Sequence, residues 1–393
     1  MTVQEPLSLP MTATGPFDPP DQIMAMRAGQ PIARVRFENG DLGWVIARHE
    51  TIRHVLTDPR FSARQELRRD AGETLPPAPP GVFIGMDPPD HTRYRHLLIG
   101  QFTVRRMKLL TSRIEEIAHE HLDRMEATGS PADLIPAYAA PIPAMTICEL
   151  LGVPYDFRDE FARQATTMAR ADTTMEEKRQ AVSGIISHLA DLVRQKRSEP
   201  TDDLLGGLAS EGNDLTEEEL ANMAFLVLGG GLGTTVDMLG LGTFALLRHP
   251  EQIPRLTDPE TVDHAVEELL RYLTTVRGTI RTALEDVEVD GAQIRAGESV
   301  LVSLAVGNRD AARYADPDTL DVSRSAAGHL SFGHGIHQCL GQQLARVEMR
   351  VGFAELFRRF PDLRLAVPAD DVRVRDDIFH GVDQLPVAWG AAS

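Results

Sequence analysis

The sequence predicts a mainly α-helical protein with small β-sheets near both ends of the chain. Apolar residues recur at helical spacing through most of 90–126, 141–198 and 216–249. Alternating residues, which are typical of strands, are confined to 33–48, 277–306 and short segments near the C-terminus. The sequence has no internal repeat and no low-complexity linker. We therefore expect its 393 residues to form a single large domain.

The composition excludes several classes of protein. Hydrophobic residues make up 42% of the chain, which is ample for a large core, and the formal net charge of −18 argues against a nucleic-acid binder. Two cysteines, Cys148 and Cys339, make neither a disulfide framework nor a four-ligand zinc site, so we expect a reducing cytoplasm. The first 21 residues lack the basic and apolar regions of a signal peptide, and their prolines indicate an arm over the surface.

The first third of the chain predicts a hairpin, helices and one long loop. The hairpin spans 33–48 and turns at Asn39-Gly40, and a helix at 49–57 follows it. Residues 64–85 are rich in charge and proline, which is typical of a lid or binding loop. Helical spacing then returns from Asp90 to about Glu126.

Residues 216–249 predict a long helix through the core. Thr216 and Glu219 form a capping-box pattern that marks its start. We reject a membrane span, because Asp237 lies inside the segment and basic and aromatic flanks are missing. Four glycines inside a helix cost about 1 kcal/mol each relative to alanine. They indicate either close helix packing or a flat cofactor against this face; they are Gly229, Gly230, Gly231 and Gly233.

The remainder predicts a helix at 263–272, strands within 277–306 and a helix ending at Phe360. Turns are expected at Asp290-Gly291 and Ala296-Gly297. The chain should then close with short strands around a turn at His380-Gly381; these strands are expected at 362–367, 372–375 and 385–389.

The glycine-rich segment 331–341, with the sequence SFGHGIHQCLG, carries the clearest chemical signal. It delivers Cys339 to the start of the helix that ends at Phe360. Unpaired backbone N–H groups and the helix dipole stabilise a thiolate there, which would act as a nucleophile or as a metal ligand. Cys148 lies instead in an apolar run and is expected to be a buried small hydrophobe.

Together these features resemble the cytochrome P450 family in its soluble bacterial form, over nearly the whole chain. The family's haem-binding signature is present as Phe332, Gly335, His337, Cys339 and Gly341. The family's other two motifs are a Glu-x-x-Arg pair with a third arginine and a His-x-x-x-Arg; here they are Glu268, Arg271 and Arg324, and His91 and Arg95.

The resemblance implies a haem b cofactor (iron protoporphyrin IX) with the Cys339 thiolate as the axial iron ligand. Phe332 would shield the sulfur, and Gly341 and Gly231 would let the backbone approach the porphyrin. Buried carboxylates need charged donors, and the partners implied for the two haem propionates are His91, Arg95, Arg281 and His337. The Glu268–Arg271–Arg324 set would be a buried structural network.

The sequence departs from the family where protons are delivered to dioxygen. Most relatives have an acid followed by threonine, whereas this chain has Gly233 followed by Thr234. Asp237 lies one turn further on the same helix face and is a candidate substitute. The alternatives are that Asp237 pairs with a neighbouring helix, or that water or a substrate hydroxyl carries the proton. We therefore expect substrate-assisted or loosely coupled oxygen activation.

The resemblance further implies a monooxygenase that uses O2 and takes electrons from a ferredoxin and its ferredoxin reductase. Basic residues at 90–113, with Arg346 and Arg350, favour a docking patch for an acidic donor, with a solvated helix face as the alternative. We expect no nucleic-acid partner and no membrane.

The expected substrate is bulky and partly polar, most simply a macrolide or related polyketide. The implied pocket comes from five segments: 64–85, 164–176, 225–235, 273–279 and 378–381. Several arginines were expected at its entrance: Arg64, Arg68, Arg69, Arg170 and Arg277. Other possible functions are oxidative coupling or cyclisation, peroxide-driven oxidation, and haem sensing without catalysis.

Overall fold

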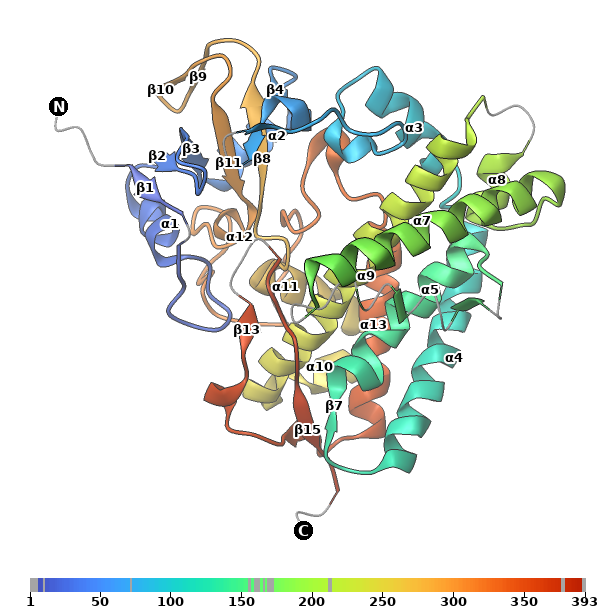
Figure 1. Cartoon of the computed structure of the whole chain (residues 1–393). Helices are drawn as coiled ribbons and strands as arrows, with labels where there is room; N and C mark the ends of the chain where they lie inside the picture. Colours follow the sequence, from blue (N-terminus) through green and yellow to red (C-terminus); the bar gives the residue numbers. More distant parts are fainter. Residues whose placement is uncertain are drawn as a thin grey trace.

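The protein is helical, with a sheet region at one end (Figure 1). The structure is a computed structural model, and it describes these residues: 6–9, 11–70, 73–154, 157–158, 163–164, 167, 173–210, 214–375 and 379–390. The predicted class, mainly α with small β-sheets, is confirmed.

The largest sheet has six strands in the order β1-β2-β3-β11-β8-β4. It joins distant parts of the chain, because β11 pairs parallel to β3 and antiparallel to β8. The predicted hairpin is confirmed as β2 and β3, and Gly40 has the positive φ of +87° that its turn requires. The strand bounds are β1 Leu7–Ser8, β2 Ile32–Arg36, β3 Leu42–Ile46, β4 Phe61–Ser62, β8 Gly278–Ala283 and β11 Ser299–Ser303.

Helix α9, Glu217–Arg248, runs through the helical body (Figure 1). Its predicted capping box is confirmed, with Thr216 and Glu219 each bonded to the other's backbone. Its second half packs closely on α13, where a Cβ at Gly242 would clash with the ring of Phe353. Among the described residues, α9 is the one helix long and apolar enough to cross a membrane, and half of its apolar window is buried, as in a core helix.

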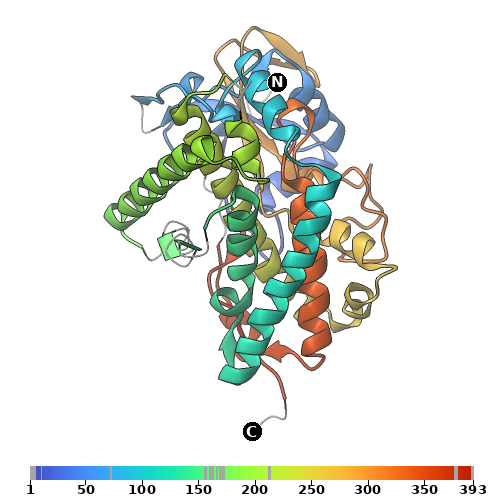
Figure 2. The same ribbon diagram turned by 90° about the vertical axis from the view of Figure 1, so that its right-hand side faces the viewer.

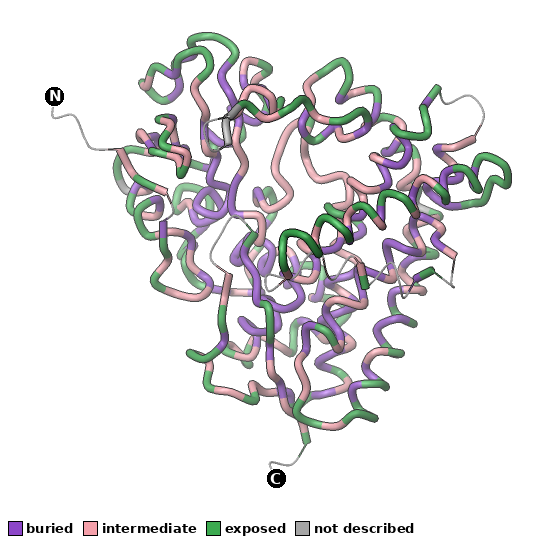
Figure 3. The backbone as a smooth tube through the Cα atoms, viewed as in Figure 1, coloured by how far each residue is buried: buried purple, intermediate pink, exposed green. Residues whose placement is uncertain are grey.

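The other long helices surround α9, and α4 and α13 lie side by side (Figure 2). Buried backbone follows α9, α13 and the inner strands, whereas the outer face of α7 is exposed (Figure 3). The bounds are α3 Asp90–Ile99, α4 Val104–Thr128, α5 Pro141–Leu151, α7 Met175–Ser198, α11 Val262–Leu273 and α13 Gln342–Arg359. The shorter helices are α1 Asp21–Ala25, α2 His49–Thr57, α8 Leu204–Ala209, α10 Pro254–Thr257 and α12 Leu304–Gly307.

Two local predictions were wrong. The helix expected over 90–126 is two helices, because the chain breaks after Ile99 and Thr103 starts a new helix by accepting a hydrogen bond from the Arg106 N–H at 3.2 Å. The turn expected at His380-Gly381 contains the start of strand β14, which pairs with β13. The remaining strands are β5 Arg69–Asp70, β6 Glu73–Thr74, β7 Ala132–Asp133, β9 Val287–Val289, β10 Ala292–Ile294, β12 Arg364–Leu365, β13 Val374–Arg375, β14 Gly381–Val382 and β15 Pro386–Ala388.

Candidate functional site

Cys339 lies in a tight loop directly before α13. Its N–H donates to the Phe332 carbonyl at 2.8 Å, which closes the loop. Gly333 and Gly335 adopt φ of +68° and +74°, and a Cβ at Gly335 would also clash with the backbone of Leu56. Glycine is therefore required at Gly335 for both conformation and space. The loop places the Cys339 thiol at the start of α13, as predicted.

The surroundings of Cys339 both oppose and support a thiolate. Burial raises the pKa of the thiol, whereas the backbone N–H groups of Gly341 and Gln342 and the charges of Arg95 and Arg346 lower it. Burial is the largest of these effects, so the pKa of the thiol lies above its ordinary value. A metal cation at the sulfur would reverse the balance, because a coordinating thiol loses its proton outright.

A cluster of cationic and imidazole groups lies beside this loop. The rings of His91 and His337 are 4.2 Å apart, and His91 is 1% exposed. Neither ring nitrogen of His91 forms a hydrogen bond of normal geometry, although the Ile336 backbone is close, and Nε2 of His337 also lacks a partner. Within the described residues, Arg95 and Arg281 donate to neutral oxygens, those of Gln338, Thr279 and Ile280.

The electrostatics of this cluster point to a missing anion. Burial, followed by the charge of Arg281, lowers the pKa of His337 to about 3. Burial and the charge of Arg68 lower the pKa of Arg281 to about 10. Among the described residues, no carboxylate forms an ion pair with His91, Arg95, Arg281 or His337. Because buried cations without counter-ions are costly, the cluster fits a ligand that brings carboxylates of its own.

Arg68 belongs to this cluster, whereas we expected it at the pocket entrance. Its Nε is buried without a partner, and burial lowers its pKa. It lies in the proline-rich 64–85 segment, far in sequence from Arg281, so only the fold brings the two together. The length and charge of this loop were the features of the sequence that could have indicated a site role for Arg68.

The glycines of α9 divide into two sets. A Cβ at Gly229, Gly230 or Gly233 would meet nothing within 4 Å, so this side of the helix faces open space. A Cβ at Gly231 would lie 2.7 Å from Ile147 of α5. Gly231 is therefore a helix-packing glycine, and its assignment to the cofactor-binding set is corrected.

Thr234 lies on the open side and donates from Oγ1 to the Gly230 carbonyl at 2.9 Å. This bond closes back on the preceding turn and leaves the hydroxyl next to open space. A flat group fits against this side, since three glycines present no side chain to it.

Asp237 does not face this open side as a free acid. It is buried, forms an ion pair with Arg375, and lies against Gly381 of β14. Asp237 is paired, as one alternative expected, but its partner lies on strand β13 and not on a neighbouring helix. Its assignment as the catalytic acid is therefore corrected, because its carboxylate is held by a guanidinium.

A buried acid that we did not predict lies behind α9. Glu348 of α13 is 2% exposed, and its Oε2 accepts from Thr235 at 3.3 Å. The Thr146 hydroxyl lies near the same carboxyl group, although Oε1 has no hydrogen bond of normal geometry among the described residues. Burial raises the pKa of Glu348 to about 8. Glu348 falls four residues after Leu344, on the apolar face of α13. An acidic residue on an apolar helix face was the feature of the sequence that could have indicated a buried acid.

The predicted Glu268–Arg271–Arg324 network is present and buried. Arg271 donates to both carboxylate oxygens of Glu268, at 2.7 and 2.8 Å, and Nε of Arg324 reaches the same carboxylate at 3.2 Å. Arg271 also donates to the carbonyls of Asn308 and Pro317. These contacts join α11 to the segment that follows α12 and leads to the Cys339 loop.

The predicted pocket segments are only partly described. Met168, Arg170 and Ile378 lie outside the described residues. Arg64 pairs with Glu66, and Arg277 is buried against His380, so Arg277 does not face an entrance as expected.

Comparison with known proteins finds one family over nearly the whole chain. The family model described as Cytochrome P450 matches residues 154–373. The chain is 46% identical to "Cytochrome P450 105C1" of a Streptomyces species, covering 99% of this chain and all of that one. It is 39% identical to "Mycinamicin IV hydroxylase/epoxidase" of Micromonospora griseorubida, again covering 99% of this chain and all of that one. The crystal structure of cytochrome P450 MoxA from Nonomuraea recticatena matches with a TM-score of 0.92 and 42% identity, covering 98% of this chain and 99% of that one.

Proposed function

Because the chain belongs to the cytochrome P450 family and is a haem-thiolate monooxygenase by that membership, we propose that it uses O2 and ferredoxin-derived electrons to oxidise a bulky secondary metabolite. The cofactor proposed is haem b, which when bound supplies the iron at which O2 is activated. The observation that carries the proposal is the cluster beside Cys339, in which His91, Arg95, Arg281 and His337 form no ion pair with a carboxylate of the described residues.

Each site residue has a definite role in this proposal. The Cys339 sulfur would ligate iron, and the N–H groups of Gly341 and Gln342 would hydrogen-bond it and tune its basicity. Phe332, with the Arg346 guanidinium 4.6 Å from its ring centre, would limit water at the sulfur. The carboxylates of the cofactor would be bound by His91, Arg95, Arg281 and His337, with Arg68 as a further cation.

The opposite face of the site would be formed by α9. Gly229, Gly230 and Gly233 leave room for the flat group, and the Thr234 hydroxyl would hydrogen-bond the reacting oxygen while Gly230 orients it. No acid stands at Gly233, and Asp237 is held by Arg375. We propose that water or a substrate hydroxyl supplies the proton, so that turnover is loosely coupled or substrate-assisted.

Coupling can be measured with Gly233→Asp. The new side chain would enter open space, so the fold should be kept. In the wild type we expect more NADH to be consumed than product to be formed. In the variant the two amounts should become nearly equal. One-to-one coupling in the wild type, with an unchanged rate in Gly233→Asp, would refute substrate-assisted delivery.

The substrate proposed is a macrolide or related polyketide, supported by the similarity to the mycinamicin IV hydroxylase/epoxidase. A spectral binding screen against such compounds, followed by mass analysis under labelled dioxygen, tests it. A monooxygenase places one labelled atom in the product. Unlabelled product would favour the second candidate, oxidative coupling or cyclisation, and turnover with peroxide alone would favour peroxide-driven oxidation. The missing acid at Gly233 is the observation that favours these alternatives.

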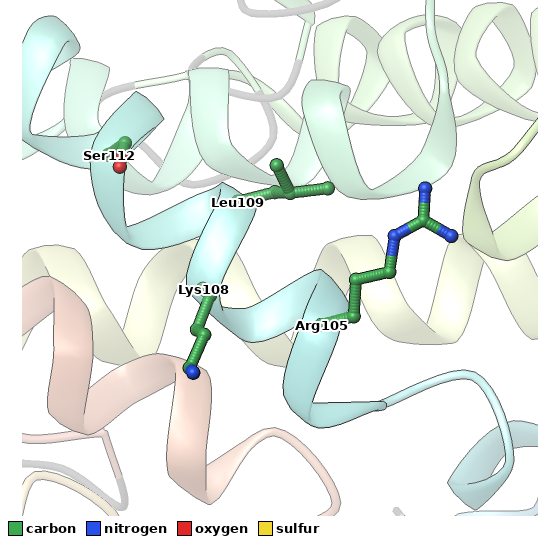
Figure 4. Close-up of a pocket in the computed structure, with 4 residues that line it drawn as sticks. All are labelled: Arg105, Lys108, Leu109 and Ser112. Atoms are coloured by element: carbon green, nitrogen blue, oxygen red, sulfur yellow. The ribbon is translucent and has the colours of Figure 1, made fainter.

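The electron donor proposed is a ferredoxin with its reductase, in the cytoplasm. Only part of the expected basic patch is free for docking, since Arg93 pairs with Glu219 and Arg113 with Glu149. What remains is a shallow hollow on α4, lined by Arg105, Lys108, Leu109 and Ser112. Arg105 and Leu109 project to the same side of the helix (Figure 4).

A further inference from the structure

Two ion pairs join α11 to α13, the helix that starts directly after the Cys339 loop. Glu267 pairs with Arg346 at 2.6 Å, and one turn further along both helices Asp263 pairs with Arg350 at 3.8 Å. The side chains of Glu267 and Arg346 are 26% and 28% exposed, whereas that of Asp263 is 76% exposed. The Glu267 pair is therefore the one closer to Cys339 along α13, and it is the less screened by water.

The carboxylate of Glu267 binds two neighbouring side chains. Its Oε1 accepts from Nε of Arg346 at 2.6 Å, and its Oε2 accepts from Nη2 of Arg346 at 3.0 Å. Oε2 also lies 3.1 Å from Nε2 of His329, whose Nδ1 accepts from the Ser331 N–H at 3.2 Å. Since Nδ1 accepts, His329 carries its proton on Nε2 and donates it to Glu267. Burial raises the pKa of Glu267, but these hydrogen bonds lower it to about 2, so the carboxylate is charged at neutral pH.

Both groups held by this carboxylate reach the loop that carries the thiolate. The Arg346 guanidinium lies 4.6 Å from the ring centre of Phe332, and the His329 ring lies 5.7 Å from the same ring. The Phe332 carbonyl in turn accepts the Cys339 N–H. Nη1 of Arg346 donates to the carbonyl and side chain of Gln342, whose own N–H lies beside the Cys339 sulfur. Arg346 therefore reaches back along α13 toward the sulfur.

The charge of Arg346 acts on this sulfur, and Glu267 offsets it. Burial raises the pKa of the Cys339 thiol, and the charges of Arg95 and Arg346 are among the effects that lower it. In the proposed haem site, the carboxylates of the cofactor would match the charge of Arg95. Arg346 has its counter-charge within the protein, because Glu267 supplies it from α11. Glu267 thus limits the positive charge that the thiolate experiences.

We propose that Glu267 is a positioning residue that keeps the reduction potential of the bound cofactor low, by holding Arg346 against Phe332 and cancelling its charge beside the thiolate. The inference rests on the proposed haem-thiolate function and deepens it. Reduction moves one electron from the ferredoxin-type donor, which is oxidised, to the cofactor, and no bond forms or breaks. Because that electron adds negative charge next to Cys339, a nearby cation favours reduction and a nearby carboxylate opposes it.

The direction in which the reduction potential of the holoenzyme changes tests this inference, by spectroelectrochemical titration. Glu267→Gln keeps an acceptor for Arg346 but removes the negative charge, so the potential should rise. Reduction should become about tenfold more favourable, or ~59 mV for one electron. Arg346→Gln should lower the potential, because the carboxylate then lacks its cation. Arg346→Lys keeps the charge and should recover most of that loss, and the variant that combines Glu267→Gln with Arg346→Gln should lie between the two single variants.

Asp263→Asn is the matched control. It removes one negative charge from the ion pair one turn further along α13 and should change the reduction equilibrium less than twofold, because this pair is more exposed and farther along the helix from Cys339. All the substituted side chains are partly exposed, so the variants should fold. A thiolate-type carbonyl spectrum in each of them checks that the sulfur ligand is kept.

The outcomes separate this inference from the proposed function. If the pair only excludes water from the sulfur, Glu267→Gln and Arg346→Gln should shift the potential in the same direction, and that result would overturn the inference. So would an unchanged potential in Glu267→Gln, or a shift of equal size in Asp263→Asn, since net charge would then be the cause. A wild-type protein that binds no haem and gives no thiolate-type carbonyl spectrum would instead refute the haem site itself.

Discussion

At the scale of single residues, the site is marked by groups that the protein leaves without partners. Among the described residues, His91 and His337 have ring nitrogens without hydrogen bonds of normal geometry, and the hydrogen-bond acceptors of the buried Arg281 are neutral oxygens. A protein that folds around such groups carries a cost in free energy. Binding a dianionic cofactor would remove that cost. Substitution of these residues should therefore raise the stability of the cofactor-free protein and lower the retention of the cofactor.

Arg281→Leu tests this opposition. Removing a buried cation that forms no ion pair with a described carboxylate should leave the cofactor-free protein as stable as the wild type, or more stable by about 1 kcal/mol or more. The same change should lower haem retention at least tenfold, measured by transfer of haem to apomyoglobin. Arg281→Lys keeps the charge and should lie between the two. A variant that loses stability without haem and keeps haem as the wild type does would contradict this assignment.

Glu348 predicts a pH dependence of stability. Burial raises its pKa to about 8, well above the ordinary value of 4.5, so the folded protein binds a proton that the unfolded chain releases. Its contribution is therefore fully present below pH 4.5 and is lost as the pH rises through about 8, at ~1.4 kcal/mol for each pH unit between. Glu348→Gln should flatten the unfolding free energy between pH 5 and 8. The exposed Glu218→Gln should leave the slope unchanged; parallel slopes in all three proteins would exclude this titration.

The sequence could supply the site residues that form motifs, but not those defined by distant partners. Cys339, His91 and Arg95 were identified from spacing and family resemblance. Arg68 meets Arg281, and Asp237 meets Arg375 across 138 residues, only after the chain has folded. A prediction from helix periodicity placed Asp237 on the correct face, yet periodicity carries no information about what covers that face.

At the scale of elements, the glycines of α9 serve two purposes that the sequence alone left open. Close packing applies to Gly231, which lies against α5, whereas its neighbours face open space, as the proposed cofactor requires. The two groups should respond in opposite ways to alanine.

Gly229→Ala should stabilise the cofactor-free protein by up to about 1 kcal/mol, through helix propensity. Gly231→Ala adds the same propensity but places its methyl 2.7 Å from Ile147, so it should gain nothing or destabilise by about 1–3 kcal/mol. Chemical denaturation of the two cofactor-free variants measures the difference. Equal stabilisation by both would show that α5 does not pack on Gly231.

Element boundaries were predictable where local chemistry sets them. The capping box at Thr216 and the turn at Gly40 depend on neighbouring residues, and both were found from sequence. The break between α3 and α4 was missed because helical spacing continues across it. The pairing of β14 with β13 was missed because His380-Gly381 has the composition of a turn, and only tertiary contacts make it extended.

At the scale of the whole molecule, charge organises how partners approach. The net charge of −18 repels an acidic donor, so productive docking needs a local basic surface. Arg346 pairs with Glu267 and Arg350 with Asp263, which leaves the start of α4 as the exposed part of the expected patch. Arg105 pairs with Asp202 between two exposed side chains, a weak contact in water, and the described residues give Lys108 no ion pair.

Lys108→Glu should therefore slow reduction by a ferredoxin about tenfold at low ionic strength, and the difference should shrink as salt shortens the screening length toward 8 Å and below. Stopped-flow measurement of the second-order rate constant against salt checks this. Lys178→Glu on α7, at the end of that helix remote from Asp202, makes the same change in net charge and is the matched control. If docking uses the hollow around Leu109, only Lys108→Glu lowers the rate, and Leu109→Ser lowers it without altering the salt dependence. Equal slowing by both charge reversals would mean that net charge, and not this surface, governs the encounter.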